Sequence, residues 1–74
     1  MAQVDEVPIR DESIRLGQFL KLASLIDSGA DAKDVIASSL VTVNGDVETR
    51  RGRRLRHGDV VTFGDHAARV TPSR

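Results

Sequence analysis

Apolar residues recur at helical spacing in the first half of the chain. They follow the i, i+3, i+4, i+7 pattern that places side chains on one face of a helix. The positions that share this face are Leu16, Phe19, Leu20, Ala23 and Ile26. The spacing predicts a helix over about residues 14–26, capped by Asp11 or Ser13. Leu22 and Leu25 lie off this stripe, and the pattern leaves open whether they pack on a second element or form an apolar surface.

A second, shorter helix is expected after the break at residues 28–30. Gly29 is a natural terminator for the first helix, and Asp31 is a favourable N-cap for the second. On one face the second helix should then carry Ala32, Val35, Ile36 and Ser39. Because the connection is so short, the two helices should pack against each other.

The pattern changes to alternation at Val41-Thr42-Val43, which is typical of a half-buried strand. Asn44-Gly45 follows, and we expect φ > 0 at the glycine, as a tight hairpin turn requires. A two-residue loop would place Val43 opposite Asp46, whereas a three-residue loop would place it opposite Val47. The longer, bulged turn keeps the valines on one face and is therefore the predicted arrangement.

The remaining strands surround a segment that is poor in apolar residues. Leu55 is the only apolar residue between Val47 and Val60, so it should anchor that segment to the core. Other inward-facing positions are expected at Val61, Phe63, Ala68 and Val70. Near the start, Val7-Pro8-Ile9 should be extended, as an edge strand or a lead-in, since proline cannot donate to a strand ladder.

These patterns predict a single α+β domain over residues 1–74, in which two packed helices are followed by a small antiparallel sheet. Residues 1–6 and 72–74 should be loose. A chain of 74 residues has a small core, so nearly every apolar residue must be used. The core is expected to contain Phe19, Leu20, Ile36, Val43 and Phe63.

Charge is unevenly distributed, although 11 basic and 11 acidic residues give a formal net charge of zero. Residues 1–34 hold seven acids and four bases, whereas residues 35–74 hold four acids and seven bases. A net charge of zero is not the usual signature of a nucleic-acid-binding protein. The positive field is therefore local, and its centre is a run of five arginines at Arg50, Arg51, Arg53, Arg54 and Arg56.

This arginine segment, residues 50–56, suits phosphate binding. Guanidinium groups bind phosphate in bidentate geometry and stay charged at any working pH. Only Glu48 and Asp59 lie near in sequence, so the five arginines cannot all find acidic partners. If they bind phosphate, the arginines should be exposed, with an electrostatic rather than an architectural role. The alternative is a solvated edge strand whose charge discourages aggregation, although lysine would serve that purpose equally.

Composition argues against several other classes of protein. The chain has no cysteine, which excludes a disulfide or a cysteine-based zinc site, and we expect no metal or cofactor. His57 lies in a loop and His66 in a turn, and no phosphate loop or acid pair indicates catalysis, so we do not expect an enzyme. The longest apolar run is too short to span a membrane, and the first residues do not resemble a signal peptide. A cytoplasmic protein without membrane association is expected.

Several short motifs together resemble the S4 RNA-binding domain. They are Arg15-Leu16 with Phe19-Leu20, Ser28, Ala32-Lys33, Val35-Ile36, Val41, Val43-Asn44-Gly45 and Gly58-Asp59-Val60-Val61. The resemblance covers about residues 14–63 and is greatest to small stand-alone bacterial S4-like proteins of the YbcJ type, which also share the run at residues 47–51. It implies the αL fold and RNA binding across a basic face of the helices and the neighbouring loop. By position, the implied RNA-binding candidates are Arg15, Lys21, Lys33 and the arginine segment.

Two positions depart from the pattern of that family. Gly17 stands where an acid usually follows Arg-Leu, and Gly29 stands where an arginine often follows the serine of the turn between the helices. Both lie in the helical part of the usual RNA face. Their presence implies that this chain relies more on the arginine segment.

The leading hypothesis is a monomeric RNA-binding module for structured RNA, with ribosomal RNA as one candidate. Phe19 and Phe63 are the only aromatic residues and occupy core positions, so base stacking on single strands is not expected. One alternative is a protein-interaction module with an apolar helix surface around Leu22 and Leu25. Another is a DNA-binding helix-turn-helix, which the acidic residues near the start of the second helix disfavour.

Overall fold

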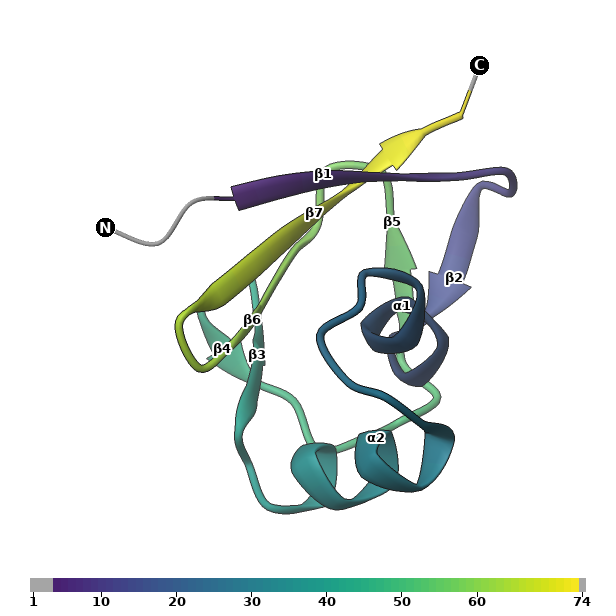
Figure 1. Ribbon diagram of the computed structural model, residues 1–74. Helices are drawn as coiled ribbons and strands as arrows, with labels where there is room; N and C mark the ends of the chain where they lie inside the picture. Colours follow the sequence, from purple (N-terminus) through teal and green to yellow (C-terminus); the bar gives the residue numbers. More distant parts are fainter. Residues whose placement is uncertain (1–3, 74) are drawn as a thin grey trace.

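The computed structural model describes residues 4–73, which contain two helices and two β-sheets (Figure 1). In chain order the elements are β1 (Val4–Ile9), β2 (Ser13–Arg15), α1 (Leu16–Leu22), α2 (Gly29–Ala37), β3 (Val41–Val43), β4 (Asp46–Val47), β5 (Arg54–Arg56), β6 (Val60–Phe63) and β7 (His66–Pro72). The larger sheet has the strand order β1-β7-β6-β3-β4, and β2 pairs with β5 in a separate sheet. Both helices lie on one side of the larger sheet, with β2 and β5 beside α1 (Figure 1).

The predicted order of two helices followed by a small antiparallel sheet is wrong in two respects. β1 and β2 precede both helices. The five-stranded sheet is mixed, because β1 runs parallel to β7 while the other neighbouring strands pair in antiparallel fashion. Parallel strands require a long connection, and here nearly the whole fold lies between the two strands. Local alternation cannot reveal a pairing between segments so far apart in the sequence.

The first residues described form part of an edge strand. Residues 4–6, which were expected to be loose, pair with residues 67–69 of β7. Pro8 also lies in β1, at the edge of the sheet, where a missing N–H is tolerated. Pro72 is the last residue of β7, and the N–H of Ser73 donates to the carbonyl of Ile9 at 2.9 Å. Residues 1–3 and 74, also expected to be loose, lie outside the described part of the chain.

α1 is shorter than the helix predicted over about residues 14–26. At its start, residues 14–15 belong to β2 and pair with residues 54–55 of β5. Neither Asp11 nor Ser13 caps the helix, since the residue at the N-cap position is the last one of β2 and gives no side-chain hydrogen bond. Pairing with a distant strand thus overrides the helical pattern at these positions.

The break between the helices lies earlier than the sequence suggests. Ser24 has a φ of 59°, a left-handed conformation that ends α1. α2 begins at Gly29, and its N-cap is Ser28, whose hydroxyl accepts from the N–H of Asp31 at 3.3 Å. The predictions of Gly29 as a terminator and Asp31 as the N-cap are therefore wrong. Both residues belong to the first turn of α2.

The turn at Asn44-Gly45 is a two-residue turn and not the longer, bulged turn predicted. Its two residues have φ of 53° and 90°, which confirms the positive φ expected at the glycine. Val43 pairs with Asp46, so Val47 lies opposite Thr42. As a result the Val47 side chain is on the exposed face, with 58% of its surface accessible. The preference of a tight turn for its own geometry outweighs the gain from burying one valine.

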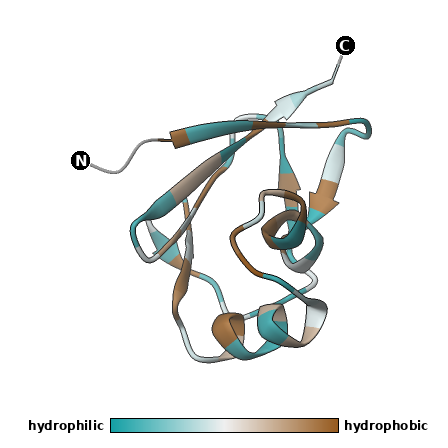
Figure 2. Cartoon of the chain, viewed as in Figure 1, coloured by the Kyte–Doolittle hydropathy of each residue, from teal (hydrophilic) through white to brown (hydrophobic). Residues whose placement is uncertain are grey.

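The core lies between the two helices and the larger sheet, and hydrophobic segments occur on both (Figure 2). Four of the five predicted core residues are at most 1% exposed, namely Phe19, Leu20, Ile36 and Val43. Phe63 is only half-buried, because it ends β6 beside the turn to β7. The other inward-facing positions predicted in the strands, Leu55, Val61, Ala68 and Val70, are buried. Leu55 therefore anchors the arginine segment as expected.

Candidate functional site

The arginine segment lies against the beginning of α1. The N–H of Leu16 donates to the carbonyl of Arg53 at 2.8 Å, and the N–H of Gly17 donates to the carbonyl of Arg51 at 3.1 Å. The first N–H groups of a helix have no acceptor within the helix. Here, backbone carbonyls of the arginine segment take the place of a capping side chain. This contact fixes the segment beside α1 and Arg15.

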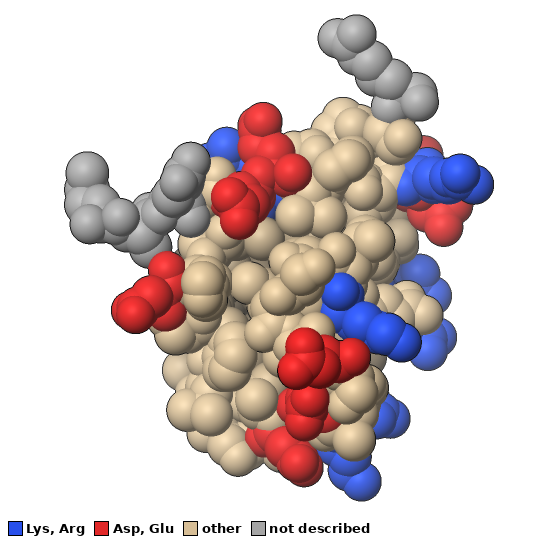
Figure 3. All heavy atoms as spheres, in the orientation of Figure 1, with Lys and Arg blue, Asp and Glu red and all other residues tan. Residues whose placement is uncertain are grey.

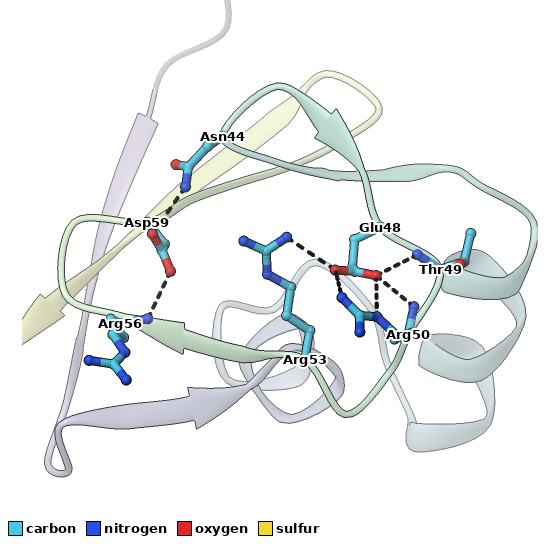
Figure 4. Close-up of polar contacts among 7 residues, drawn as sticks. All are labelled: Asn44, Glu48, Thr49, Arg50, Arg53, Arg56 and Asp59. Atoms are coloured by element: carbon cyan, nitrogen blue, oxygen red, sulfur yellow. Dashed lines mark hydrogen bonds and ion pairs between the residues drawn. The ribbon is translucent and has the colours of Figure 1, made fainter.

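Asp59 holds the far end of the arginine segment (Figure 4). Its Oδ2 accepts from the N–H of Arg56 at 2.8 Å, and its Oδ1 accepts from Nδ2 of Asn44 at 3.0 Å. Oδ1 of Asn44 in turn accepts from the N–H of Val60 at 2.9 Å. Asp59 therefore bonds the backbone of Arg56, whose guanidinium forms no ion pair within residues 4–73.

Glu48 is the buried charged residue among those described, at 6% exposure. Its Oε2 accepts from the N–H groups of Thr49 and Arg50, both at 3.0 Å, and from Nε of Arg50 at 3.3 Å. Its Oε1 accepts from Nη1 of Arg53 at 3.1 Å, and both guanidinium groups converge on the carboxylate (Figure 4). The Arg53 side chain is only 34% exposed. The expectation that all five arginines are exposed and purely electrostatic is therefore wrong for Arg53.

These bonds make stability depend on pH. Hydrogen bonds from the side chain and then the backbone of Arg50, helped by Arg53 and opposed by burial, lower the pKa of Glu48 from 4.5 to about 2. Because the folded pKa is depressed, the carboxylate stabilises the fold fully above pH 4.5, and this is lost as the pH falls toward 2. Arg50 is largely exposed, so we expect a contribution of roughly 1–3 kcal/mol.

Urea unfolding of the wild type and Glu48→Gln between pH 7 and pH 2.5 measures this contribution. The wild type should be more stable at pH 7, and the difference between the two proteins should shrink below pH 4.5. Asp46→Asn, in the same hairpin, serves as the control, because the Asp46 side chain is exposed. A wild-type advantage that stays constant with pH would contradict the role given to the Glu48 charge.

A surface cavity of about 440 Å³ lies beside the beginning of α1. Its lining combines cations with small residues and contains no acid: Arg15, Gly17, Gln18, Lys21, Gly29, Ala32, Arg51 and Gly52. The three cations come from the end of β2, from α1 and from the loop between β4 and β5. Basic side chains gather along the right edge of the molecule in Figure 3, whereas acidic ones lie mainly over α2 and β1. We call the cavity lined by these eight residues the cationic cavity.

The other candidates named from the sequence lie outside this cavity. Arg54 and Arg56 are exposed on β5, where Nη1 of Arg54 donates to the hydroxyl of Ser13 at 3.3 Å. Lys33 is exposed on α2. Arg50 and Arg53 pair with Glu48. The structure thus places Arg15, Lys21 and Arg51 around one cavity, and leaves the rest of the set outside its lining.

The sequence does not reveal the importance of two residues beside the cavity, Glu48 and Gly17. Glu48 is one acid near the arginines, and nothing in its spacing distinguishes a buried carboxylate from an exposed one. Gly17 stands out only as a departure from a family pattern. A glycine in the first turn of a helix leaves room for a neighbour to pass close by, but the sequence does not show at which glycine this happens, since Gly29 in the first turn of α2 has no such neighbour.

Metal binding and membrane insertion can be examined in the part of the chain that the structure describes. No three His, Cys, Asp or Glu side chains of residues 4–73 are grouped so that they could hold a metal ion. Neither of the two helices has the length and apolar character needed to cross a membrane. Nε2 of His57 lies 3.2 Å from the carbonyl oxygen of Asp11 at the surface.

Similar solved structures share this fold. The solution structure of YbcJ from Escherichia coli, described as an αL motif involved in RNA binding, has a TM-score of 0.71 and 33% identity. The similarity covers 96% of this chain and 91% of that one. The ribosomal protein S4e of Thermoplasma acidophilum has a TM-score of 0.62 at 23% identity, over 81% of this chain and 32% of the other, and so shares the fold alone. The expectation of an αL arrangement is confirmed at this level.

Sequence comparison points the same way. A protein of Bacillus subtilis named "Probable ribosome maturation protein RlbA" is 51% identical over 74% of this chain and 78% of its own length. YbcJ of Escherichia coli is 40% identical over 77% of this chain and 81% of its own length. The pattern that defines the S4 domain family matches residues 7–71, which include both helices and all strands except the beginning of β1 and the last residue of β7. The chain therefore belongs to the S4 domain family.

Proposed function

We propose that the protein is a non-enzymatic RNA-binding module that recognises structured RNA, with ribosomal RNA as its target. The observation that carries the proposal is the cationic cavity, in which Arg15, Lys21 and Arg51 converge with no acid in the lining. Cations held together in a concave site bind phosphate more strongly than cations dispersed over a surface. Glycine and alanine make up half of the lining, which leaves room for a nucleic-acid backbone.

The names of relatives support the same partner. YbcJ is described as carrying a motif involved in RNA binding, and RlbA is named for ribosome maturation. A ribosomal RNA target for this chain is the finer part of our proposal. In this proposal the protein binds such an RNA as a monomer in the cytoplasm.

The burial of the two aromatic residues favours structured over single-stranded RNA as the target. Phe19 is buried in the core and Phe63 is half-buried, so neither provides a platform on which bases could stack. The protein should therefore contact mainly the phosphate backbone of the RNA and recognise the shape of the folded RNA. Duplex DNA is a weaker candidate, because Asp31 and Asp34 on α2 would repel phosphate.

We assign the candidate residues different roles. Arg15, Lys21 and Arg51 contact phosphate in the cationic cavity, while Arg54, Arg56 and Lys33 extend the basic face around it. Arg50 and Arg53 act in part through Glu48, because their guanidinium groups already bond its carboxylate. Arg50 keeps most of its surface exposed and can also meet phosphate.

Salt dependence of RNA binding tests the proposal. Each phosphate contact contributes a slope of about −0.7 to −0.9 in log K against log salt. Three contacts should lower affinity for a folded RNA hairpin about 20- to 40-fold between 50 mM and 200 mM salt. A single-stranded RNA of the same composition should bind more weakly. Affinity that is independent of salt, or a preference for the single strand, would contradict the proposal.

A protein-interaction role has one observation in its favour. Leu22 is 52% exposed on α1 and lines a second cavity together with Ile14. Leu25, which was expected to share that surface, is half-buried against the core and lines a different cavity. A pull-down with Leu22→Asp after removal of RNA separates this role from RNA binding, since Leu22 lies outside the cationic cavity.

A further inference from the structure

The loop that carries Arg51 is held from two sides. On one side, the Glu48 carboxylate accepts from the backbone of Thr49 and Arg50. The N–H of Glu48 itself donates to the carbonyl of Val41 at 3.0 Å, which ties this corner to the larger sheet. On the other side, the carbonyl of Arg51 accepts from the N–H of Gly17 at 3.1 Å. Arg51 thus lies between a buried carboxylate and the beginning of α1.

Gly17 provides the place for the Arg51 side chain. A Cβ added at Gly17 would lie 2.7 Å from Cγ and 3.3 Å from Cδ of Arg51. The stem of the arginine therefore passes directly over the glycine, at a distance that no other residue type allows. Cγ is close to the backbone, so the side chain could not avoid a methyl group by moving its tip alone. Gly29 lines the same cavity, yet a Cβ there would have nothing within 4 Å.

We propose that Glu48 and Gly17 are positioning residues for Arg51, so that RNA affinity depends on both although neither is a cation. The inference deepens the proposed RNA-binding function and rests on it. Glu48 fixes the loop by charge-assisted hydrogen bonds, and Gly17 admits the stem of Arg51 into the cationic cavity. Preorganisation of this kind raises affinity, because the arginine is ordered before RNA binds.

Glu48 makes the proposal sharply testable, because simple electrostatics predicts the opposite sign. Glu48→Gln and Asp46→Asn each remove one negative charge from the same hairpin. If charge alone mattered, both changes would strengthen binding of a polyanion. We expect Glu48→Gln to weaken binding to a folded RNA hairpin about 5- to 10-fold. Asp46→Asn should leave affinity unchanged or raise it, since Asp46 is exposed and outside the cavity.

Gly17→Ala and Gly29→Ala form a second matched pair. Both residues are helical and line the cationic cavity, and alanine favours a helix at both. We expect Gly17→Ala to weaken RNA binding about 5- to 10-fold, while Gly29→Ala changes it less than about 2-fold. Because Cγ of Arg51 must shift in Gly17→Ala, the melting temperature of the variant is measured as well, and affinities are compared at a temperature where both glycine variants are folded.

A double-mutant cycle with Arg51→Gln shows whether the two residues act through Arg51. In the Arg51→Gln background, Glu48→Gln and Gly17→Ala should each change affinity less than about 2-fold, because the positioned group is gone. The measurements are made on the full chain, at a temperature where circular dichroism shows every variant folded. Losses that persist in that background, or equal strengthening by Glu48→Gln and Asp46→Asn, would overturn the inference. Failure of the wild type to bind RNA would instead overturn the proposed function, and the inference with it.

Discussion

Changing Lys21 and Arg51 together to glutamine should weaken binding to a folded RNA hairpin by at least about 100-fold. The two cations enter the cationic cavity from α1 and from the arginine segment, and neither forms an ion pair within residues 4–73. Each would offer charge-assisted hydrogen bonds to a phosphate, worth about 1.5–3 kcal/mol. The slope of log K against log salt should become shallower by about 1.4–1.8. Fluorescence anisotropy over a range of salt concentrations measures both quantities.

The matched control removes two positive charges elsewhere. Arg10 is exposed in the loop between β1 and β2. Arg69 is on β7, and its Nη1 lies 3.9 Å from Oε1 of Glu6. Neither lines the cationic cavity, so Arg10→Gln with Arg69→Gln should lower affinity less than about 3-fold. Equal losses in the two double variants would mean that binding responds to total charge, and that the cavity has no special part in it.

Phe19→Ala should cost roughly 3–5 kcal/mol of stability and leave the domain largely unfolded. Phe19 is fully buried in α1 and is the largest side chain in the core. A domain of this size commonly has a free energy of unfolding of only a few kcal/mol, so the cavity left by alanine would remove most of its stability. Thermal unfolding followed by circular dichroism gives the result directly.

Leu22→Ala on the same helix is the control for Phe19→Ala. Leu22 is 52% exposed, so removal of its side chain should change stability by about 0.5 kcal/mol or less. RNA affinity measured on folded Leu22→Ala should equal that of the wild type. A Phe19→Ala protein that melts like the wild type would show that the described packing of α1 is not what stabilises the fold.

Helical periodicity and the hairpin dipeptide were sufficient to identify the buried face of α1 and the turn after β3. Leu16, Phe19 and Leu20 lie where the 3.6-residue period requires, and Gly45 has the positive φ that the turn demands. These features depend on a few neighbouring residues, so they can be derived from local sequence. The boundaries of α1 could not, because residues 14–15 pair with a strand far along the chain.

The uneven distribution of charge along the sequence likewise indicated only part of the candidate site. The cluster at Arg50–Arg56 indicated a basic segment, but the sequence gives no reason to distinguish its five arginines from one another. In three dimensions the Arg53 guanidinium donates to the Glu48 carboxylate. The Arg51 side chain instead passes close to Gly17 and lines a cavity together with Arg15 and Lys21. Whether an arginine meets an acid or a cavity depends on the path of the backbone between β4 and β5.

The sequence by itself determined the residue types that fill the core, the position of the hairpin and the location of the positive charge. Each is a property of short segments, whose periodicity and composition act wherever the segment lies. Only the tertiary structure decided the parallel pairing of β1 with β7, the burial of Glu48 and the convergence of Arg15, Lys21 and Arg51. Those depend on contacts between segments far apart in the chain, whose free energy is realised only when the whole domain closes around its core.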